Sequence, residues 1–365
     1  MAGIKSWVKK FIPKSIITYW RMRGEIRLSC ALMNSIEAGN HLHEDFLIGT
    51  PIHQNLGDHL IAVAEDALIS EYRLEKKFVE ISMEMYEAFR PRLEKAIPSD
   101  AVIYITGGGW MGDVWPVDEM ALQSMLHSFK ENKIIIFPQT IFYHKRDEES
   151  RSLLESSRKA FAVCKDVTLC VRERNSYDFA CENYPGVKVV LTPDVAMFYE
   201  SYSPQNCKRK DCKKALLCLR SDIEKVDSTE KMACLKKLLD HYGYIAHMTD
   251  TIYPKRVLSE DRKKTVNKKL KEFAETGLVV TDRLHGMLFC YLTRTPCIAL
   301  DNATKKVAGV YDTWLKECNW IFPLFKYKDM LECEQFIQRC VDYNFSFDVS
   351  VYKQFKELKR IVRDG

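Results

Sequence analysis

The feature that most constrains the fold is a regular alternation of short apolar runs with longer amphipathic stretches, which begins at Phe46. The apolar runs have the length of buried strands, and the stretches between them have helical periodicity. Strands that alternate with helices form βαβ units, so a parallel sheet with helices on both faces is expected. The first predicted strands occupy residues 46–49, 78–81, 101–106, 133–138, 167–171 and 187–192, and the predicted helices between them include residues 60–72, 91–97 and 148–163.

A second series follows residues 201–214, a polar and basic stretch that contains Pro204 and is typical of a linker. Its predicted strands occupy residues 215–219, 244–248, 278–281, 296–300 and 320–324. We therefore expect two Rossmann-like parallel-sheet domains that face a cleft. The predicted parts of the chain are an N-terminal segment 1–45, a first domain 46–200, a linker 201–214, a second domain 215–330 and C-terminal helices 331–365 that pack across both domains.

The N-terminal segment is basic and amphipathic. Residues 1–28 contain seven basic residues and one acidic residue, whereas the rest of the chain is close to neutral. Trp7, Phe11 and Trp20 fall on an apolar helical stripe beside lysines, and Pro13 favours two short helices over one. Aromatic and basic side chains on a helix suit an anionic membrane surface. The alternative is a helix that packs on the body and keeps its lysines in water.

Composition argues against several classes of protein. The near-neutral body does not suit a nucleic-acid-binding protein, despite the net charge of +5. Apolar runs fall far short of the ~20 residues that span a bilayer, and Pro13 interrupts any secretory signal, so a cytoplasmic location is expected. Thirteen cysteines occur without a Cys-x-x-Cys motif, which favours reduced, buried thiols and no metal site.

Polar residues follow the first predicted strand, where ligands of open α/β sheets bind. Asn55, Gly57 and Asp58 lie there, just before a predicted helix. The backbone amides near Gly57 can meet an anion. Asp58 is a candidate base, or alternatively the cap of the helix. Asp194, which follows the sixth predicted strand, has the same two interpretations.

A run of three glycines follows the third predicted strand and ends in Gly108 and Gly109. Their backbone N–H groups can face a phosphate or a sugar, and Trp115 can stack on a pyranose ring. Asp113, in the same stretch, is a further candidate base. A dinucleotide site is not expected, because the helix is delayed and the strand is third in order. The alternative is a tight turn with core tryptophans.

Cationic residues follow strands of the second series. Arg220 comes after residues 215–219, and Arg283 and His285 come after residues 278–281, where a strand runs into a helix. Arg283 and a helix N-terminus can hold one carboxylate or phosphate between them. His285 titrates near neutral pH and can donate a proton. The alternatives are an exposed salt bridge for Arg220 and a structural role for His285.

Taken in order, these motifs resemble the polysaccharide pyruvyl transferase family over about residues 46–325. The motifs that carry the resemblance are Asn55-x-Gly57-Asp58, Gly107-Gly108-Gly109-x-x-x-Asp113, Pro138-Gln139-Thr140, Val171-Arg172-Glu173-x-x-Ser176, Pro193-Asp194, Leu219-Arg220, Thr281-Asp282-Arg283-Leu284-His285-Gly286, Ala299-Leu300-Asp301-Asn302, Lys305 and Tyr311-Asp312-Thr313-Trp314. The stretch from Thr281 to Gly286 is the most specific of them.

The resemblance implies a fold similar to the GT-B glycosyltransferases and transfer of pyruvate from phosphoenolpyruvate to a sugar as a ketal, with no other cofactor. The catalytic candidates are His285 as the general acid and Asp58, Asp113 or Asp194 as the base across the cleft. The implied substrate-binding residues are Arg220, Arg283, Leu284, Asn55, Gly57, Gly108, Gly109, Trp115, Gln139, Arg172, Asp301 and Asn302. Phosphoenolpyruvate is expected on the second domain and the acceptor on the first. A lipid-linked oligosaccharide acceptor would place the enzyme on the inner face of the cell membrane.

Two other functions remain open at this point. A GT-B glycosyltransferase that uses a nucleotide sugar could hold a diphosphate with Arg283 and His285, although no segment obviously recognises a nucleobase. A catalytically inactive carbohydrate-binding scaffold is disfavoured, because it would not need an acid–base set.

Overall fold

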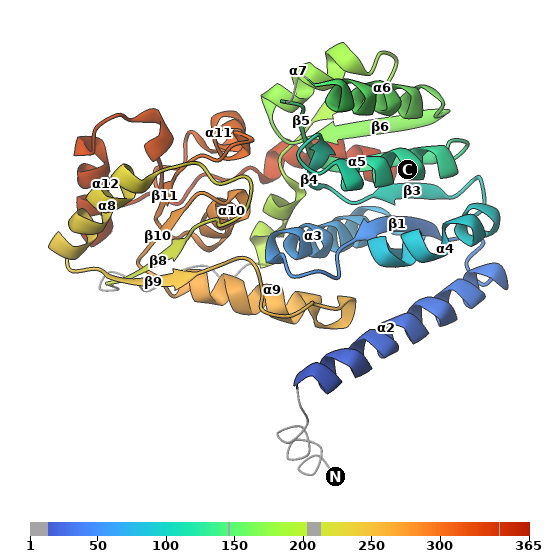
Figure 1. Ribbon diagram of the computed structural model, residues 1–365, viewed down its shortest axis with the longest axis horizontal. Coiled ribbons are helices and arrows are strands. Elements are labelled where there is room, and N and C mark those ends of the chain that lie inside the picture. Colours follow the sequence, from blue (N-terminus) through green and yellow to red (C-terminus); the bar gives the residue numbers. More distant parts are fainter. Residues whose placement is uncertain (1–13, 145–146, 203–212, 343) are drawn as a thin grey trace, which may run out of the picture.

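The computed structural model describes residues 14–144, 147–202, 213–342 and 344–365, which form two parallel sheets with helices packed around them (Figure 1). We call the parts built on these sheets the first and the second domain. The first sheet consists of β1 (Asp45–Thr50), β2 (Phe78–Ser82), β3 (Val102–Ile105), β4 (Gly108–Gly112), β5 (Lys133–Phe142), β6 (Asp166–Val171) and β7 (Lys188–Leu191). Its strand order is β2-β1-β3-β5-β6-β7, with β4 paired to β5.

Apolar cores cover both faces of the first sheet. Successive side chains of a strand point to opposite faces, so neighbouring residues enter different cores. Phe46 and Ile48 of β1 join one apolar core, and Leu47 between them joins another. The helices of this domain are α3 (Leu56–Tyr72), α4 (Met83–Ala96), α5 (Pro116–Ser128), α6 (Glu148–Ala162) and α7 (Arg174–Asn183). Side chains of α4 to α7 belong to the core of Phe46, and side chains of α3 belong to the core of Leu47.

The second sheet repeats this plan. It consists of β8 (Lys214–Cys218), β9 (Ile245–Thr249), β10 (Leu278–Thr281), β11 (Cys297–Ala299) and β12 (Ile321–Pro323), in the order β12-β11-β10-β8-β9. Its helices are α8 (Thr229–His241), α9 (Ser259–Ala274), α10 (Leu284–Thr293), α11 (Lys306–Val310) and α12 (Leu331–Asp342). Every strand pair in both sheets is parallel. The predicted α/β fold of two Rossmann-like parallel-sheet domains is confirmed.

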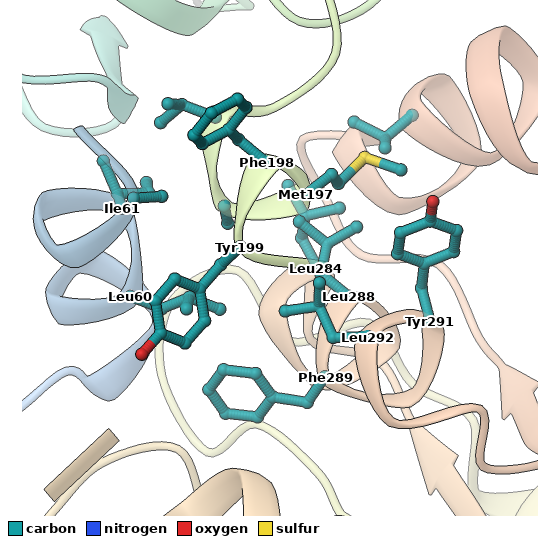
Figure 2. Packing of buried hydrophobic residues seen from close by; sticks show 14 of the residues in the cluster. Leu60, Ile61, Met197, Phe198, Tyr199, Leu284, Leu288, Phe289, Tyr291 and Leu292 are labelled. Atoms are coloured by element: carbon teal, nitrogen blue, oxygen red, sulfur yellow. The ribbon is translucent and has the colours of Figure 1, made fainter. Parts of the chain in front are cut away.

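A shared apolar core joins the two domains. Met197, Phe198 and Tyr199 of the 3-10 helix η1 (Val195–Tyr202) lie between Leu60 of α3 and Leu288 of α10 (Figure 2). The C-terminal helix α13 (Lys356–Arg363) then returns to the first domain, where it packs on α3. The chain thus crosses between the domains both before the second sheet and after it.

Helix α2 (Lys14–Glu37) extends away from the body (Figure 1). Its C-terminal part packs on α4, because Met33 and Ile36 are buried there and Arg92 binds Glu37 with Nε 2.7 Å from Oε1. The membrane prediction for residues 1–28 falls partly on residues 1–13, which lie outside the described ranges. Within those ranges, no helix is long and apolar enough to cross a bilayer.

Two local predictions differ from the structure, and one falls largely outside it. The glycine run is not a tight turn: it leads into strand β4, which is possible because Gly108 and Gly112 adopt φ values of 147° and 121°. Helix α4 begins at Met83, well before the predicted start at residue 91, because the Ser82 hydroxyl caps it by accepting a bond from Met85 N at 3.2 Å. Most of the predicted linker, residues 203–212, lies outside the described residues.

A buried contact between α3 and α9 links the domains at one side of the interface. Arg262 of α9 donates from Nε to Nδ1 of His59 on α3, at 3.3 Å. The other ring nitrogen, Nε2, lies 2.8 Å from the carbonyl oxygen of His53. Because a carbonyl only accepts, Nε2 carries the proton and the imidazole is neutral. Burial lowers the pKa of His59 from 6.5 to about 4.

This pKa predicts a loss of stability in acid. Between pH 6.5 and about 4 the unfolded chain binds a proton at residue 59 that the folded chain does not bind. The free energy of unfolding therefore falls as the pH decreases through this window, by up to about 3 kcal/mol from this group. Urea unfolding at several pH values should show a shallower decline for His59→Gln than for the wild type. His43→Gln, at an exposed position, should keep the wild-type decline, and equal declines for all three proteins would contradict the assignment.

Candidate active site

A cleft of about 560 Å³ lies between the two domains. Its lining includes Arg172 just after β6, Arg220 just after β8 and Arg283 just after β10, so strand ends of both sheets meet there. The predicted site residues that line it are Asn55, Asp58, Gly109, Trp115 and Arg172 of the first domain and Arg220, Arg283, Leu284 and His285 of the second. Segments far apart in the sequence are thus brought to one place.

The junction between β10 and α10 positions His285. Thr281 Oγ1 accepts a hydrogen bond from Arg283 N at 3.0 Å, and a Cβ atom on Gly286 would lie 2.3 Å from this oxygen. The tight junction therefore requires glycine, and it directs His285 toward the first domain. There, a Cβ atom on Gly57 would lie 2.1 Å from His285 Nδ1, so the imidazole packs directly on the backbone at the start of α3.

The other nitrogen of His285 makes no hydrogen bond within the described residues. Nε2 is buried without a hydrogen-bond partner in the described part of the chain, and it lies 3.8 Å from Asp194 Oδ2. Burial lowers the pKa of His285, and this outweighs the opposite effect of Asp194 and Asp58. The ring is therefore neutral near pH 7 when the cleft is empty. An anion bound at Nε2 would raise this pKa.

A buried ion pair between Arg172 and Asp194 lies next to His285. Arg172 Nη1 donates to Asp194 Oδ2 at 2.7 Å, and Arg172 Nε donates to Thr140 Oγ1 at 2.8 Å. Asp194 also accepts from the backbone N–H of Ala196 at 2.9 Å. Both members of the pair are almost fully buried, and a Cβ atom on Gly109 would lie 2.6 Å from Arg172 Nη2. Asp194 is thus fixed in orientation between Arg172 and His285.

The second-domain wall carries cations that are held by carboxylates. Arg220 donates from Nε and Nη2 to Asp222 at 2.8 and 3.0 Å, and its Nη2 lies 2.9 Å from Glu224 Oε1. Arg283 donates from Nη2 to Asp250 Oδ2 at 3.2 Å. Its Nε is buried and makes no hydrogen bond within the described residues. Arg283 therefore keeps at least one N–H donor for a ligand.

Lys306 is a lining residue that the sequence analysis missed. Its Nζ lies 2.7 Å from Glu224 Oε2, and burial lowers the pKa of Lys306. The Asp301-Asn302 motif supports the loop before it: Asp301 accepts from Ala308 N at 3.2 Å, and Asn302 Oδ1 accepts from Thr304 Oγ1 at 3.0 Å. These two residues lie outside the lining. In the sequence, Lys306 follows Lys305 and could not be told apart from a surface lysine.

The first-domain wall is acidic and aromatic. Asn55, not Asp58, caps α3: its Oδ1 accepts from Gly57 N at 3.0 Å, and its Nδ2 donates to Asp58 Oδ2 at 2.7 Å. His53 Nε2 lies 3.5 Å from the same Asp58 oxygen. Asp118 also lines the cleft, and burial raises its pKa, with Asp58 adding to the rise. Trp115 remains 36% exposed, which leaves its ring open to a ligand.

Other predicted site residues serve the framework instead. Asp113 accepts from the backbone N–H of His144 at 3.0 Å and from Ser150 Oγ at 2.7 Å, away from the cleft lining. The position of Asp113 therefore does not support its predicted role as a base. Gln139 donates from Nε2 to the carbonyl of Thr106 at 2.8 Å, next to Gly108 in the pairing of β4 with β5. Within the described ranges, no group of three or more His, Cys, Asp or Glu side chains is placed to hold a metal ion.

Two curated proteins are similar to this chain over most of its length. General stress protein 30 of Bacillus subtilis (strain 168) is 28% identical, and the match covers 87% of this chain and 91% of that protein. Pyruvyl transferase 1 of Schizosaccharomyces pombe is 25% identical, and that match covers 74% of this chain and 70% of that protein. Among solved structures, the UDP-GlcNAc 2-epimerase of Neisseria meningitidis overlays at a TM-score of 0.43 and 9% identity, covering 88% of this chain and 99% of the other.

A family model described as "Polysaccharide pyruvyl transferase" matches residues 55–304. The match begins at Asn55, the cap of α3, and ends just before Lys306. It therefore includes most of the residues on both walls of the cleft. This chain belongs to the polysaccharide pyruvyl transferase family.

Proposed function

We propose that this chain transfers pyruvate from phosphoenolpyruvate to two hydroxyl groups of one sugar, forming a ketal on a polysaccharide or lipid-linked oligosaccharide precursor. The observation that carries the proposal is a pair of buried nitrogen atoms, Arg283 Nε and His285 Nε2, which have no hydrogen-bond partner among the described residues. Buried polar groups are normally paired, so two such atoms in one cleft indicate a missing ligand. An anion with several oxygens suits both.

The second-domain wall supplies the charge for such a donor. Phosphoenolpyruvate carries a carboxylate and a phosphate, and Arg220, Arg283 and Lys306 line the same side of the cleft. Arginine binds planar carboxylates and phosphates through two parallel N–H groups, and lysine adds a compact charge. We assign the donor to this wall, and the acceptor to the wall with Trp115 and Asp58.

The reaction needs one proton added to carbon and two protons removed from hydroxyl groups. A proton adds to the methylene carbon of the donor, and a sugar hydroxyl attacks the carbon that bears the phosphate and loses its proton. Phosphate then leaves, and a second hydroxyl of the same sugar attacks the same carbon to close the ring. The two hydroxyl groups release two protons. One of them balances the proton added to the methylene carbon, and the other leaves with phosphate. Arginine and lysine side chains stabilise the charge on the departing phosphate.

His285 and Asp58 are the acid and the base in this scheme. His285 is neutral in the empty cleft, and the negative donor raises its pKa so that it can carry and deliver a proton. Asp194 stays bound to Arg172 and orients His285. Asp58 lines the opposite wall, where it can accept the proton of the attacking hydroxyl.

Product analysis tests the proposal. The full chain is incubated with phosphoenolpyruvate and a panel of glycosides and lipid-linked oligosaccharides that present galactose, mannose or N-acetylhexosamine. We expect phosphate release that depends on both substrates, and mass spectrometry should find a pyruvate ketal on one acceptor. Thermal stabilisation by UDP- or GDP-sugars but not by phosphoenolpyruvate would instead favour the alternative, a nucleotide-sugar glycosyltransferase.

Substitutions on the two walls should separate donor from acceptor. Arg283→Ala removes a charge-assisted contact worth ~1.5–3 kcal/mol, so KM for phosphoenolpyruvate should rise by one to two orders of magnitude. Trp115→Ala removes the stacking surface, so KM for the sugar should rise instead. Steady-state kinetics with each substrate varied in turn measures both. A reversed pattern would exchange the two assignments.

His285 should control turnover rather than folding. A general acid contributes ~10²–10⁴-fold in rate, so His285→Ala should lose turnover by about that factor and keep its secondary structure. His285→Gln can still donate a hydrogen bond, so it should retain donor binding and remain slow. Circular dichroism melts are recorded beside the kinetics. A variant that melts early yet turns over normally would remove His285 from the mechanism.

We also propose that residues 1–28 bring the enzyme to the membrane face where lipid-linked acceptors are assembled. Seven basic residues and one acidic residue lie in this segment, and each basic residue near an anionic surface contributes ~1 kcal/mol. Vesicles of phosphatidylcholine and phosphatidylserine should sediment the full chain at low salt and release it at high salt. A version that lacks residues 1–28 should stay in the supernatant. Equal sedimentation of both proteins would rule out this role.

A further inference from the structure

We propose that Arg262, a residue of the second domain, positions residues 53–58 of the first domain, which form part of the acceptor wall. This segment consists of the loop before α3 and the first residues of that helix, and we refer to it below as the loop. The assignment of this loop to the acceptor rests on the proposed function. Arg262 lies on α9, and its side chain is buried. Its guanidinium reaches across the domain boundary and contacts β2 and the segments on both sides of the loop.

The contacts of the guanidinium bracket the loop. Arg262 Nη2 donates to the carbonyl oxygen of Pro51 at 3.0 Å, just before the loop. Arg262 Nε donates to His59 Nδ1 at 3.3 Å, just after it. Glu80 of β2 holds the guanidinium in place, with Oε1 2.7 Å from Nη2. One buried side chain therefore ties both ends of the loop to the second domain.

The main chain between these ends is also bonded to the second domain. Leu56 N donates to the carbonyl of Thr251 at 2.8 Å, and Tyr253 N donates to the carbonyl of Gln54 at 2.7 Å. The carbonyl of His53 accepts from the ring of His59 and from Val257 N, at 2.8 and 3.3 Å. The partners of these backbone bonds in the second domain all lie within residues 251–257. The side chains of His53, Asn55 and Asp58 are left to line the cleft.

This arrangement makes the acceptor wall a product of both domains. Asp58 faces the cleft only while the loop keeps this path, and the Gly57 backbone at its end packs on His285. The donor-wall side chains Arg220 and Lys306 are instead bonded to carboxylates of their own domain. Loss of the Arg262 contacts should therefore impair acceptor handling and spare donor binding.

The test compares Arg262→Lys with a matched control. Lysine keeps the charge but cannot reproduce the two-ended contact of the guanidinium. Arg256→Lys is the control, because Arg256 forms an exposed ion pair between the domains, 2.5 Å from Glu84 on α4, outside the loop. We expect kcat/KM for the acceptor to fall ~10–100-fold in Arg262→Lys, as for a small misplacement of reacting groups, with KM for phosphoenolpyruvate within twofold. Arg256→Lys should match the wild type in both.

Hydrogen–deuterium exchange provides a readout that needs no turnover. The backbone amides of residues 53–58 should exchange faster in Arg262→Lys than in the wild type, while residues 281–290 keep their rates. His59→Asn, which removes the ring's contacts with Arg262 and with the His53 carbonyl, serves if Arg262→Lys does not fold. Unchanged exchange in residues 53–58, or equal losses for donor and acceptor, would overturn the inference. A wild type without phosphoenolpyruvate-dependent turnover would instead refute the proposed function, while faster exchange would still support the positioning role.

Discussion

Apolar packing between the two sheets is the interaction on which the cleft depends. The side chains of η1 lie between α3 and α10, and all three belong to one core (Figure 2). Apolar burial of this kind contributes roughly 25 cal/mol per Å², so separating the domains would expose much of what stabilises the fold. The distance between the walls is therefore set by packing. The direct contact of His285 with the Gly57 backbone requires this fixed distance.

The charges of the cleft are balanced before any ligand arrives. Glu224 binds both Arg220 and Lys306, and Asp194 binds Arg172. A buried cation without a partner would be costly, so these carboxylates keep the cations in place while the cleft is empty. An incoming anion must then share the cations with the carboxylates. Selectivity is expected to favour a ligand with two anionic groups, which can engage several cations at once.

The sequence predicted the sheets well and the site in part. Buried parallel strands are continuous apolar runs, and all the predicted runs became strands. The glycine-rich β4 has no such run, so periodicity could not reveal it. Asp113 follows a strand as Asp58 does, and only the direction of the side chain separates a residue bonded to Ser150 from one that lines the cleft. Lys306 looked like any surface lysine beside Lys305, because its burial depends on long-range packing.

The return of α13 to the first domain has a consequence for synthesis. Leu358, Ile361 and Val362 of α13 pack in the same core as Leu47 and Tyr104 of the first sheet. The ribosome makes these residues only after every strand of the second sheet. Until α13 is made, part of the apolar surface of the first domain stays uncovered, and chaperones and neighbouring chains can bind it. The core that contains Leu47 is therefore completed late, whatever the order in which the two sheets form.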